Sequence, residues 1–183
     1  MNVLVAVASR HGSTLEIAEH IASGLRAEGL SADAELMSEV DDPADYDAFV
    51  IGSATYMFHW LKEAMRFVER HRRLLESRPV WIFSSGPLGE DDVDADGKDV
   101  AEAAAPKEFE KIRDLLHPSD MRVFSGAWDP DAPAIGVAER MMRLLPAAKG
   151  ALPAGDFRDW EAIEDWARQI ATDLSSTAGS ASE

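Results

Sequence analysis

The stretch ASRHGSTLEIA, residues 8–18, decides the fold class, because it joins a buried strand to an amphipathic helix. The small or apolar residues 3–8 lead into it and predict a fully buried strand. After it, apolar side chains recur at helical spacing as far as Gly29, a residue typical of a helix C-terminus. A buried strand that runs directly into such a helix favours an α/β fold.

The rest of the chain repeats this alternation. Further short apolar runs predict strands at residues 32–37, 48–53, 80–86 and 121–128. Helical patterns lie at 61–76, about 106–116 and 159–174. We therefore expect a three-layer α/β fold with a doubly wound, five-stranded parallel sheet of order 2-1-3-4-5. In such sheets a ligand binds beyond the carboxyl ends of the strands, between the first and the third.

Composition excludes several kinds of site. The chain has 183 residues and no cysteine, which excludes disulfides, thiolate metal sites and cysteine nucleophiles. Its formal net charge of −16 argues against a nucleic-acid partner, because phosphate binding needs a basic face. We expect one domain over residues 1–174 and a disordered tail at 175–183. No apolar run has the length of a membrane span or a signal peptide, so we expect a cytoplasmic protein.

The loop after the first strand combines features of an anion site and of a helix cap. Helix N-termini expose unpaired N–H groups and bind phosphate readily. The loop adds hydroxyls, a cation and a glycine: Ser9, Arg10, His11, Gly12, Ser13 and Thr14. Ser13 and Glu16 also match the capping box S-x-x-E, which would stabilise a helix without any ligand. Capping alone does not explain the other hydroxyls and the arginine, so we favour phosphate binding.

The kind of phosphate compound follows from the motifs that are absent. The loop lacks the lysine of a nucleotide-hydrolysing P-loop and the G-x-G-x-x-G of a dinucleotide site. The chain lacks the cysteine of a low-molecular-weight phosphatase. Its third strand ends in Gly52 and Ser53 rather than in the acid of a response-regulator receiver. A monophosphate held by hydroxyls and backbone fits best.

Later loops add a surface for a flat ring. The stretch GSATYMFHW, residues 52–60, has contiguous aromatic side chains, which suit stacking better than core packing. Its candidates are Ala54, Thr55, Tyr56, Met57, Phe58 and His59, with Tyr56 the expected stacking residue. In SSGPLGE, residues 84–90, glycines and a proline let the backbone approach a heteroaromatic edge, and the candidates are Ser85, Gly86, Pro87, Leu88 and Gly89. The alternatives are an aromatic that only begins the next helix, and an ordinary turn.

Together the three loops resemble those of the flavodoxin family. The likeness is closest to the flavodoxin-domain subfamily that contains the menaquinone-dependent protoporphyrinogen IX dehydrogenase, and it covers about residues 1–174. Shared features, in order, are the phosphate loop, Gly52 to His59, RFV at 66–68, and W-x-x-[IV]-x-x-[FW]-A-R-x-I-A from Trp160 to Ala171. The resemblance implies a flavodoxin-like fold and non-covalent FMN, with its phosphate on residues 9–14 and its ring between residues 54–59 and 85–89. FMN then carries the chemistry, so no catalytic side chain and no metal is expected.

One segment departs from that subfamily. Residues 129–156 are less basic and less aromatic than the matching region of the dehydrogenase, with Arg140, Arg143 and Lys149 remaining. This puts the porphyrinogen substrate in doubt more than the cofactor. Apolar residues within 135–145 suit an amphipathic helix over a quinone or porphyrin pocket, packing on the sheet edge, or a homodimer contact.

An acidic stretch matches part of a calcium-binding motif. DVDADG, residues 92–97, matches the first half of an EF-hand, but Ala103 stands where the closing acid belongs. We interpret it as a solvated acidic loop.

The sequence leaves three functions open. The favoured one is an FMN-dependent oxidoreductase acting on a quinone or a porphyrinogen. An electron-carrier flavodoxin that docks a redox partner protein is the second, and its acidity would suit a basic partner face. The third is a flavin-free module of the same fold, since fold alone does not fix function.

Overall fold

The central layer is a parallel β-sheet, and the computed structural model describes residues 1–88, 103–133, 135 and 153–180. Its parallel strands follow the order β2-β1-β3-β5-β6. Their bounds are β1 Asn2–Ala8, β2 Ser31–Leu36, β3 Ala48–Tyr56, β5 Val80–Ser85 and β6 Asp120–Phe124. These match the predicted strands in chain order, so the predicted order 2-1-3-4-5 is confirmed.

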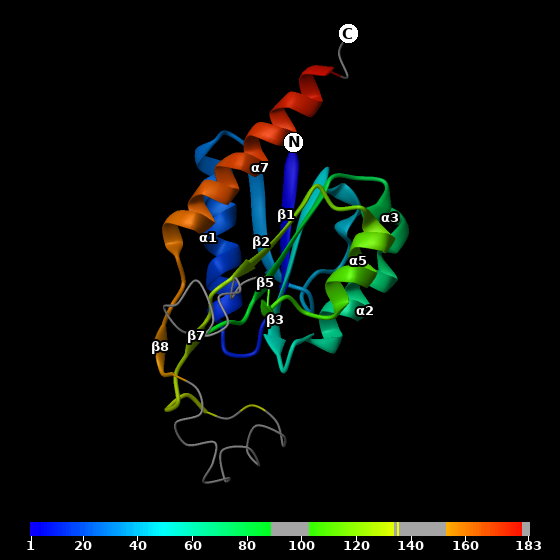
Figure 1. Ribbon diagram of the computed structural model, residues 1–183. Coiled ribbons are helices and arrows are strands. Elements are labelled where there is room, and N and C mark those ends of the chain that lie inside the picture. Colours follow the sequence, from blue (N-terminus) through cyan, green and yellow to red (C-terminus); the bar gives the residue numbers. More distant parts are fainter. Residues whose placement is uncertain (89–102, 134, 136–152, 181–183) are drawn as a thin grey trace.

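Helices cover both faces of the sheet and complete the three layers (Figure 1). On one face lie α1, Ser13–Ala27, and α7, Trp160–Ser180. On the other lie α2, Lys62–Arg70, α3, Arg72–Glu76, and α5, Glu108–Leu116. A short 3-10 helix, η1, Pro43–Asp45, precedes β3.

Side chains along the strands alternate between two cores. Val3, Val5 and Val7 of β1 pack in the core under α1 and α7. Leu4 and Ala6 pack in the core under α2, α3 and α5. Because successive side chains of a strand point to opposite faces, a strand covered on both sides is apolar throughout.

The segment after the third strand, expected to be a loop within residues 52–60, is a hairpin. β3 continues through Tyr56, and β4, His59–Trp60, pairs with it antiparallel. The turn between them, Met57 and Phe58, contains neither glycine nor asparagine, so the usual sequence signal for a tight hairpin is missing.

The predicted fifth strand, residues 121–128, is split. β6 ends at Phe124, and β7, Ala127–Trp128, pairs antiparallel with β8, Gly155–Asp156. Between them, the N–H of Gly126 donates to a loop carbonyl rather than to a neighbouring strand. The chain therefore leaves the sheet edge and forms a small ribbon.

The helix predicted at 61–76 is also split, into α2 and α3. The N–H of His71 still bonds to Phe67, but the next helical bonds begin from the His71 carbonyl, which accepts from Leu74 and Leu75. The apolar pattern continues across this break, which is why it read as one helix.

The last helix is longer than predicted. A helix at 159–174 and a disordered tail at 175–183 were expected, but α7 continues to Ser180. The hydroxyls of Ser175 and Ser176 donate to carbonyls of the preceding turn, so these serines are accommodated within the helix.

Some sequence features lie outside the described residues. They are Gly89, the acidic stretch 92–97, most of the apolar pattern within 135–145, and residues 181–183. In the described part of the chain, no helix has the length and apolar character needed to cross a membrane.

Candidate functional site

The loops after β1, β3 and β5 meet at the carboxyl end of the sheet, where a ligand was expected. β1 and β3 are neighbouring strands, and the helices that follow them, α1 and α2, cover opposite faces (Figure 1). A crevice forms at such a point because the two connections diverge.

The loop at residues 9–14 ends in a glycine cap on α1. Gly12 has a φ of 88°, a left-handed conformation that favours glycine, and its N–H donates to Ser9 Oγ at 3.2 Å. The Glu16 N–H bonds to the Gly12 carbonyl at 2.9 Å. The N–H groups of residues 13–15 precede this bond and have no partner within the helix, as at anion-binding helix ends.

The alternative interpretation of this loop, a capping box of Ser13 and Glu16, is not what the structure forms. Gly12, not Ser13, is the cap residue, and the cap makes no side-chain hydrogen bond. Glu16 Oε2 instead accepts from the Arg158 guanidinium at 2.6 Å. The helix end is therefore left for an external acceptor.

Thr14 shows most clearly that this helix end needs a partner. Its side chain is buried, with 1% of the residue exposed, and Oγ1 has no hydrogen-bond partner among the described residues. A buried hydroxyl without a partner costs about 1–3 kcal/mol. A ligand that accepts this hydrogen bond would remove that cost.

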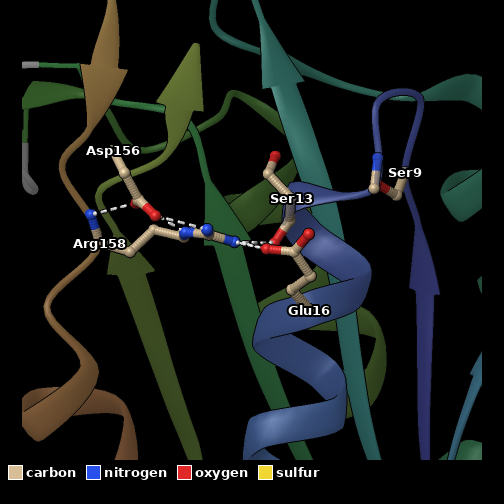
Figure 2. Close-up of polar contacts among 6 residues, drawn as sticks. Ser9, Ser13, Glu16, Asp156 and Arg158 are labelled. Carbon is tan, nitrogen blue, oxygen red and sulfur yellow. Dashed lines mark hydrogen bonds and ion pairs between the residues drawn. The ribbon is translucent and has the colours of Figure 1, made fainter. Parts of the chain in front are cut away.

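Arg158 braces the same helix end from far along the chain (Figure 2). Its guanidinium donates to the Ser13 carbonyl at 3.1 Å, to Glu16 at 2.6 Å, and to both oxygens of Asp156 at 2.8 and 2.6 Å. It also lies over the Trp160 ring, 4.4 Å from the centroid, and its side chain is 7% exposed. Arg158 thus joins β8 and the start of α7 to the first turn of α1.

These contacts favour the charged forms of both groups. The hydrogen bond to Asp156 is the main reason why the pKa of Arg158 is raised. The same bond lowers the pKa of Asp156. Because the guanidinium bonds to protein oxygens on α1 and β8, Arg158 is a positioning residue for the loop.

Arg10 and Tyr56 contact each other. The guanidinium carbon of Arg10 lies 4.7 Å from the centroid of the Tyr56 ring, a favourable cation–π arrangement. A flat ligand that stacks on Tyr56 has to use the opposite face or displace the guanidinium. Arg10, the cation expected in the first loop, thus lies against Tyr56, the residue expected to stack on a ring.

The turn of the β3–β4 hairpin holds large apolar residues in a strained conformation. Met57 and Phe58 have φ values of 50° and 62°. Positive φ at both central positions is typical of type I′ turns, which favour Asn-Gly. The residues are 83% and 56% exposed, so the strain is not offset by burial. Such outliers cluster at functional sites.

Glu108 holds the hairpin in place. Its Oε1 bonds to His59 Nδ1 at 2.9 Å, and its Oε2 accepts from the Trp60 N–H at 3.0 Å. The Lys107 N–H donates to the Phe58 carbonyl at 3.0 Å. Burial opposes ionisation of Glu108, but hydrogen bonds from His59 and Trp60 outweigh it and lower the pKa of the carboxyl. An ionised Glu108 therefore ties the hairpin to α5.

The third loop packs between the hairpin and the chain after β6. Thr55 Oγ1 and Ser84 Oγ hydrogen-bond to each other. A Cβ at Gly86 would lie 2.9 Å from the Thr55 Cβ, so glycine permits an approach that a side chain would prevent. The Gly126 N–H donates to the Pro87 carbonyl at 2.8 Å. These contacts fix residues 84–87 beside the hairpin.

The remaining candidates lie around these contacts. Ser85 is buried at the end of β5, while Ala54 and Leu88 are half-buried. The ring of His11 meets that of Trp128 edge-on, with centroids 6.3 Å apart. A hollow of about 620 Å³ opens here, lined in part by His11, Trp128 and Arg158.

The helix end fits a phosphate group. The donors are the N–H groups of residues 13–15, the buried hydroxyl of Thr14 and the hydroxyl of Ser9. Ser9 Oγ accepts from Gly12, so its own proton remains for a ligand. Within the described ranges, no group of three or more His, Asp or Glu side chains is placed to hold a metal ion.

This fold defines a class: doubly wound α/β proteins, whose ligands bind at the switch point where the open end of α1 lies. The model of the flavodoxin domain family matches residues 4–145. The chain therefore belongs to the flavodoxin domain family, as the three loops predicted, and membership implies a flavin cofactor.

Relatives along the whole chain agree with this assignment. The chain is 24% identical over 188 residues to protoporphyrinogen IX dehydrogenase (quinone) of Escherichia coli (strain K12), covering 93% of this chain and 95% of that protein. A flavodoxin from the domain Archaea has a TM-score of 0.57 at 16% identity, covering 96% of this chain and 99% of that one. A mutant flavodoxin from Pseudomonas aeruginosa has a TM-score of 0.58 at 17% identity, with the same coverage. These structural likenesses show the fold.

Sequence reasoning missed Arg158, Asp156 and Glu108. Arg158 lies 145 positions from Ser13, and a single arginine between acidic residues has no pattern that indicates a role. Its position just before α7 was the available sign of a structural role. Glu108 looked like an ordinary acid in the first turn of a helix.

Proposed function

We propose that the protein binds FMN non-covalently and acts as an FMN-dependent oxidoreductase. The observation that carries the proposal is the buried Thr14 hydroxyl, which has no partner among the described residues at an open helix end. Of the flavins, FMN suits it because it carries one terminal phosphate, which the hydroxyls of Ser9 and Thr14 and the first N–H groups of α1 would hold.

The chain's own part in this function is binding and orientation. Ser9, Thr14 and the first N–H groups of α1 would hold the phosphate, while Arg158 keeps that turn in place. Tyr56 of the hairpin and the backbone of residues 85–88 would flank the ring. When bound, FMN accepts two electrons with a proton from a reduced substrate and passes them to an acceptor.

The substrate we propose is a quinone or a porphyrinogen. The support is the resemblance, along nearly the whole chain, to a dehydrogenase named for both compounds. Steady-state turnover with a soluble quinone as acceptor and a porphyrinogen as donor tests this point. Reduction of the quinone only in the presence of the porphyrinogen is expected.

Binding of FMN is tested first, by an absorbance spectrum of the purified protein before and after addition of FMN and removal of the excess. A bound flavin spectrum with quenched flavin fluorescence is the expected result. A colourless protein that takes up no FMN would contradict the proposal and favour the flavin-free module.

An electron-carrier flavodoxin is the second candidate, favoured by the net charge of −16, which suits a basic face on a redox partner protein. A carrier exchanges electrons with such a partner but does not turn over a small substrate. Absence of quinone turnover, with FMN bound and electron transfer falling steeply at high salt, would favour it.

We also propose a cytoplasmic location and a homodimer, the latter tested by sedimentation.

A further inference from the structure

A shallow hollow of about 420 Å³ lies beside the β3–β4 hairpin, in the size range of small-molecule sites. Its lining includes the rings of Tyr56 and Trp60 and ionisable side chains from the first loop, the hairpin and α2. The ionisable residues, apart from the Tyr56 phenol, are Arg10, His59, Lys62 and Glu63. The hollow thus combines aromatic walls with charge.

The two cations of this hollow form no ion pair with the described residues. In the part of the chain that the structure describes, neither the Arg10 guanidinium nor the Lys62 ammonium makes a hydrogen bond or an ion pair. Arg10 has only its contact with Tyr56. By contrast, Arg72, Lys111, Arg122, Arg158 and Arg168 are all paired with carboxylates.

The hollow is less acidic than the protein as a whole. Arg10 and Lys62 carry two positive charges against the carboxylate of Glu63 in the lining and the ionised Glu108, which lies outside the lining and bonds to His59. In a chain of net charge −16, two cations without a described carboxylate partner are the groups that can pair with an anionic ligand.

The hairpin that contributes to the hollow also carries exposed apolar residues, which lie outside the lining. Met57 and Phe58 form the turn of the same hairpin, and their side chains are exposed in a strained conformation. A ligand that meets both features has an apolar body and an anionic group. A carboxylate suits the planar guanidinium of Arg10, with Lys62 as a second point charge.

We propose that this hollow binds the carboxylate of an organic substrate whose apolar ring system lies against the hairpin turn. The inference rests on the proposed function, because it places a substrate beside the flavin ring, and it deepens that function by naming the substrate's chemistry. A neutral quinone carries no charge to pair with Arg10 and Lys62, so the hollow favours the carboxylate-bearing electron donor.

The test compares two porphyrin probes on the FMN-loaded chain. Mesoporphyrin IX has two carboxylates, and its dimethyl ester has none. Titration followed by quenching of tryptophan fluorescence should show the diacid binding at least about tenfold more tightly than the diester. In Lys62→Gln the diacid should lose about fivefold in affinity, the size of a partly exposed ion pair, and the diester should lose nothing.

The matched control is Arg73→Gln, an exposed arginine on α3 at the opposite end of the sheet, which should leave both affinities unchanged. The FMN dissociation constant, measured separately, should be the same in Lys62→Gln as in the wild type. Equal binding of diacid and diester, or no effect of Lys62→Gln, would overturn the inference while leaving FMN binding intact.

Two other outcomes can be told apart from these. Failure to bind FMN refutes the proposed function, and titration of the FMN-free chain with the same probes then decides whether the hollow binds carboxylates at all. Binding to phosphatidylglycerol vesicles that Lys62→Gln abolishes, with no preference for the diacid, would overturn the inference and assign the surface to a lipid membrane.

Discussion

The loop at residues 9–14 and the β3–β4 hairpin lie at the same edge of the sheet but are built in opposite ways. In the first, the hydroxyl of Thr14 is buried, and Arg158 fixes the helix turn around it. In the second, Met57 and Phe58 are exposed, and the turn is strained.

This difference separates two kinds of recognition. Fixed donors around one buried point suit a small anion of constant shape, such as a phosphate. An exposed turn, in a hairpin beside cations that no described carboxylate pairs with, suits a larger, less constrained ligand. Changes in the first region should therefore alter cofactor affinity, and changes in the second should alter the hairpin and what binds beside it.

The largest effect is expected from Thr14→Val, which keeps the shape of the side chain but removes the hydroxyl. The FMN dissociation constant should rise by about 10- to 100-fold, because a hydrogen bond to a charged group is lost. The FMN-free protein should be as stable as the wild type or more stable by about 1 kcal/mol, because the buried hydroxyl has no partner there. Flavin fluorescence titration and urea unfolding measure the two quantities.

Thr14→Ser retains the hydroxyl and serves as the control for FMN affinity. If Thr14→Val bound FMN as tightly as the wild type, the phosphate would not lie on this hydroxyl.

Arg158→Gln should affect the loop at residues 9–14 indirectly, because Arg158 holds the first turn of α1 in place. Loss of the contacts to Ser13, Glu16 and Asp156 should destabilise the fold by about 1–2 kcal/mol, because a largely buried cation is removed from half-exposed partners. FMN affinity should fall by about fivefold, since the turn of α1 loses its brace. Arg72→Gln, which breaks an exposed pair with Glu76 on α3, should leave FMN affinity unchanged.

The pH dependence of stability tests the same brace. Because the pKa of Asp156 is lowered in the fold, its pairing with Arg158 stabilises the protein above the unfolded-state pKa of about 3.9. That stability is lost as pH falls through the lower folded-state pKa. The free energy of unfolding is measured from pH 6 to pH 2, a range of about four units around that value. In Asp156→Asn it should fall less over this range than in the wild type, because the variant has no carboxylate at this position to protonate.

In the hairpin, replacing Met57 by Asn and Phe58 by Gly should stabilise the protein. These residues suit a type I′ turn, and relief of the left-handed strain should raise the free energy of unfolding by about 1–2 kcal/mol. A urea midpoint equal to that of the wild type would show that the turn is not strained.

The smallest effect is expected from Glu108→Gln. The amide keeps the size of the side chain but removes the charge that bonds to His59 and the Trp60 N–H, which should cost about 1 kcal/mol. Amide hydrogen exchange should become faster at Trp60 but not at Thr14. Equal protection of Trp60 in variant and wild type would show that Glu108 does not hold the hairpin.

The sequence by itself determined the layered sheet and the place of the first loop. The apolar runs at 3–8, 48–51 and 80–83 are buried on both faces of the sheet. A strand buried on both faces is apolar at every position, so it can be recognised from its own residues without knowing which helices cover it. Gly12, next to several hydroxyls in the loop that follows a strand, likewise predicted an anion site from neighbouring residues alone.

Only the tertiary structure decided which side chains support that site. The capping box failed because Glu16 pairs with Arg158, and that pairing depends on β8 lying beside α1. The hairpin has no glycine signal, and its position depends on Glu108, 49 residues from His59. Such contacts join residues that no local pattern relates, because burial and charge pairing depend on which segments the fold brings together.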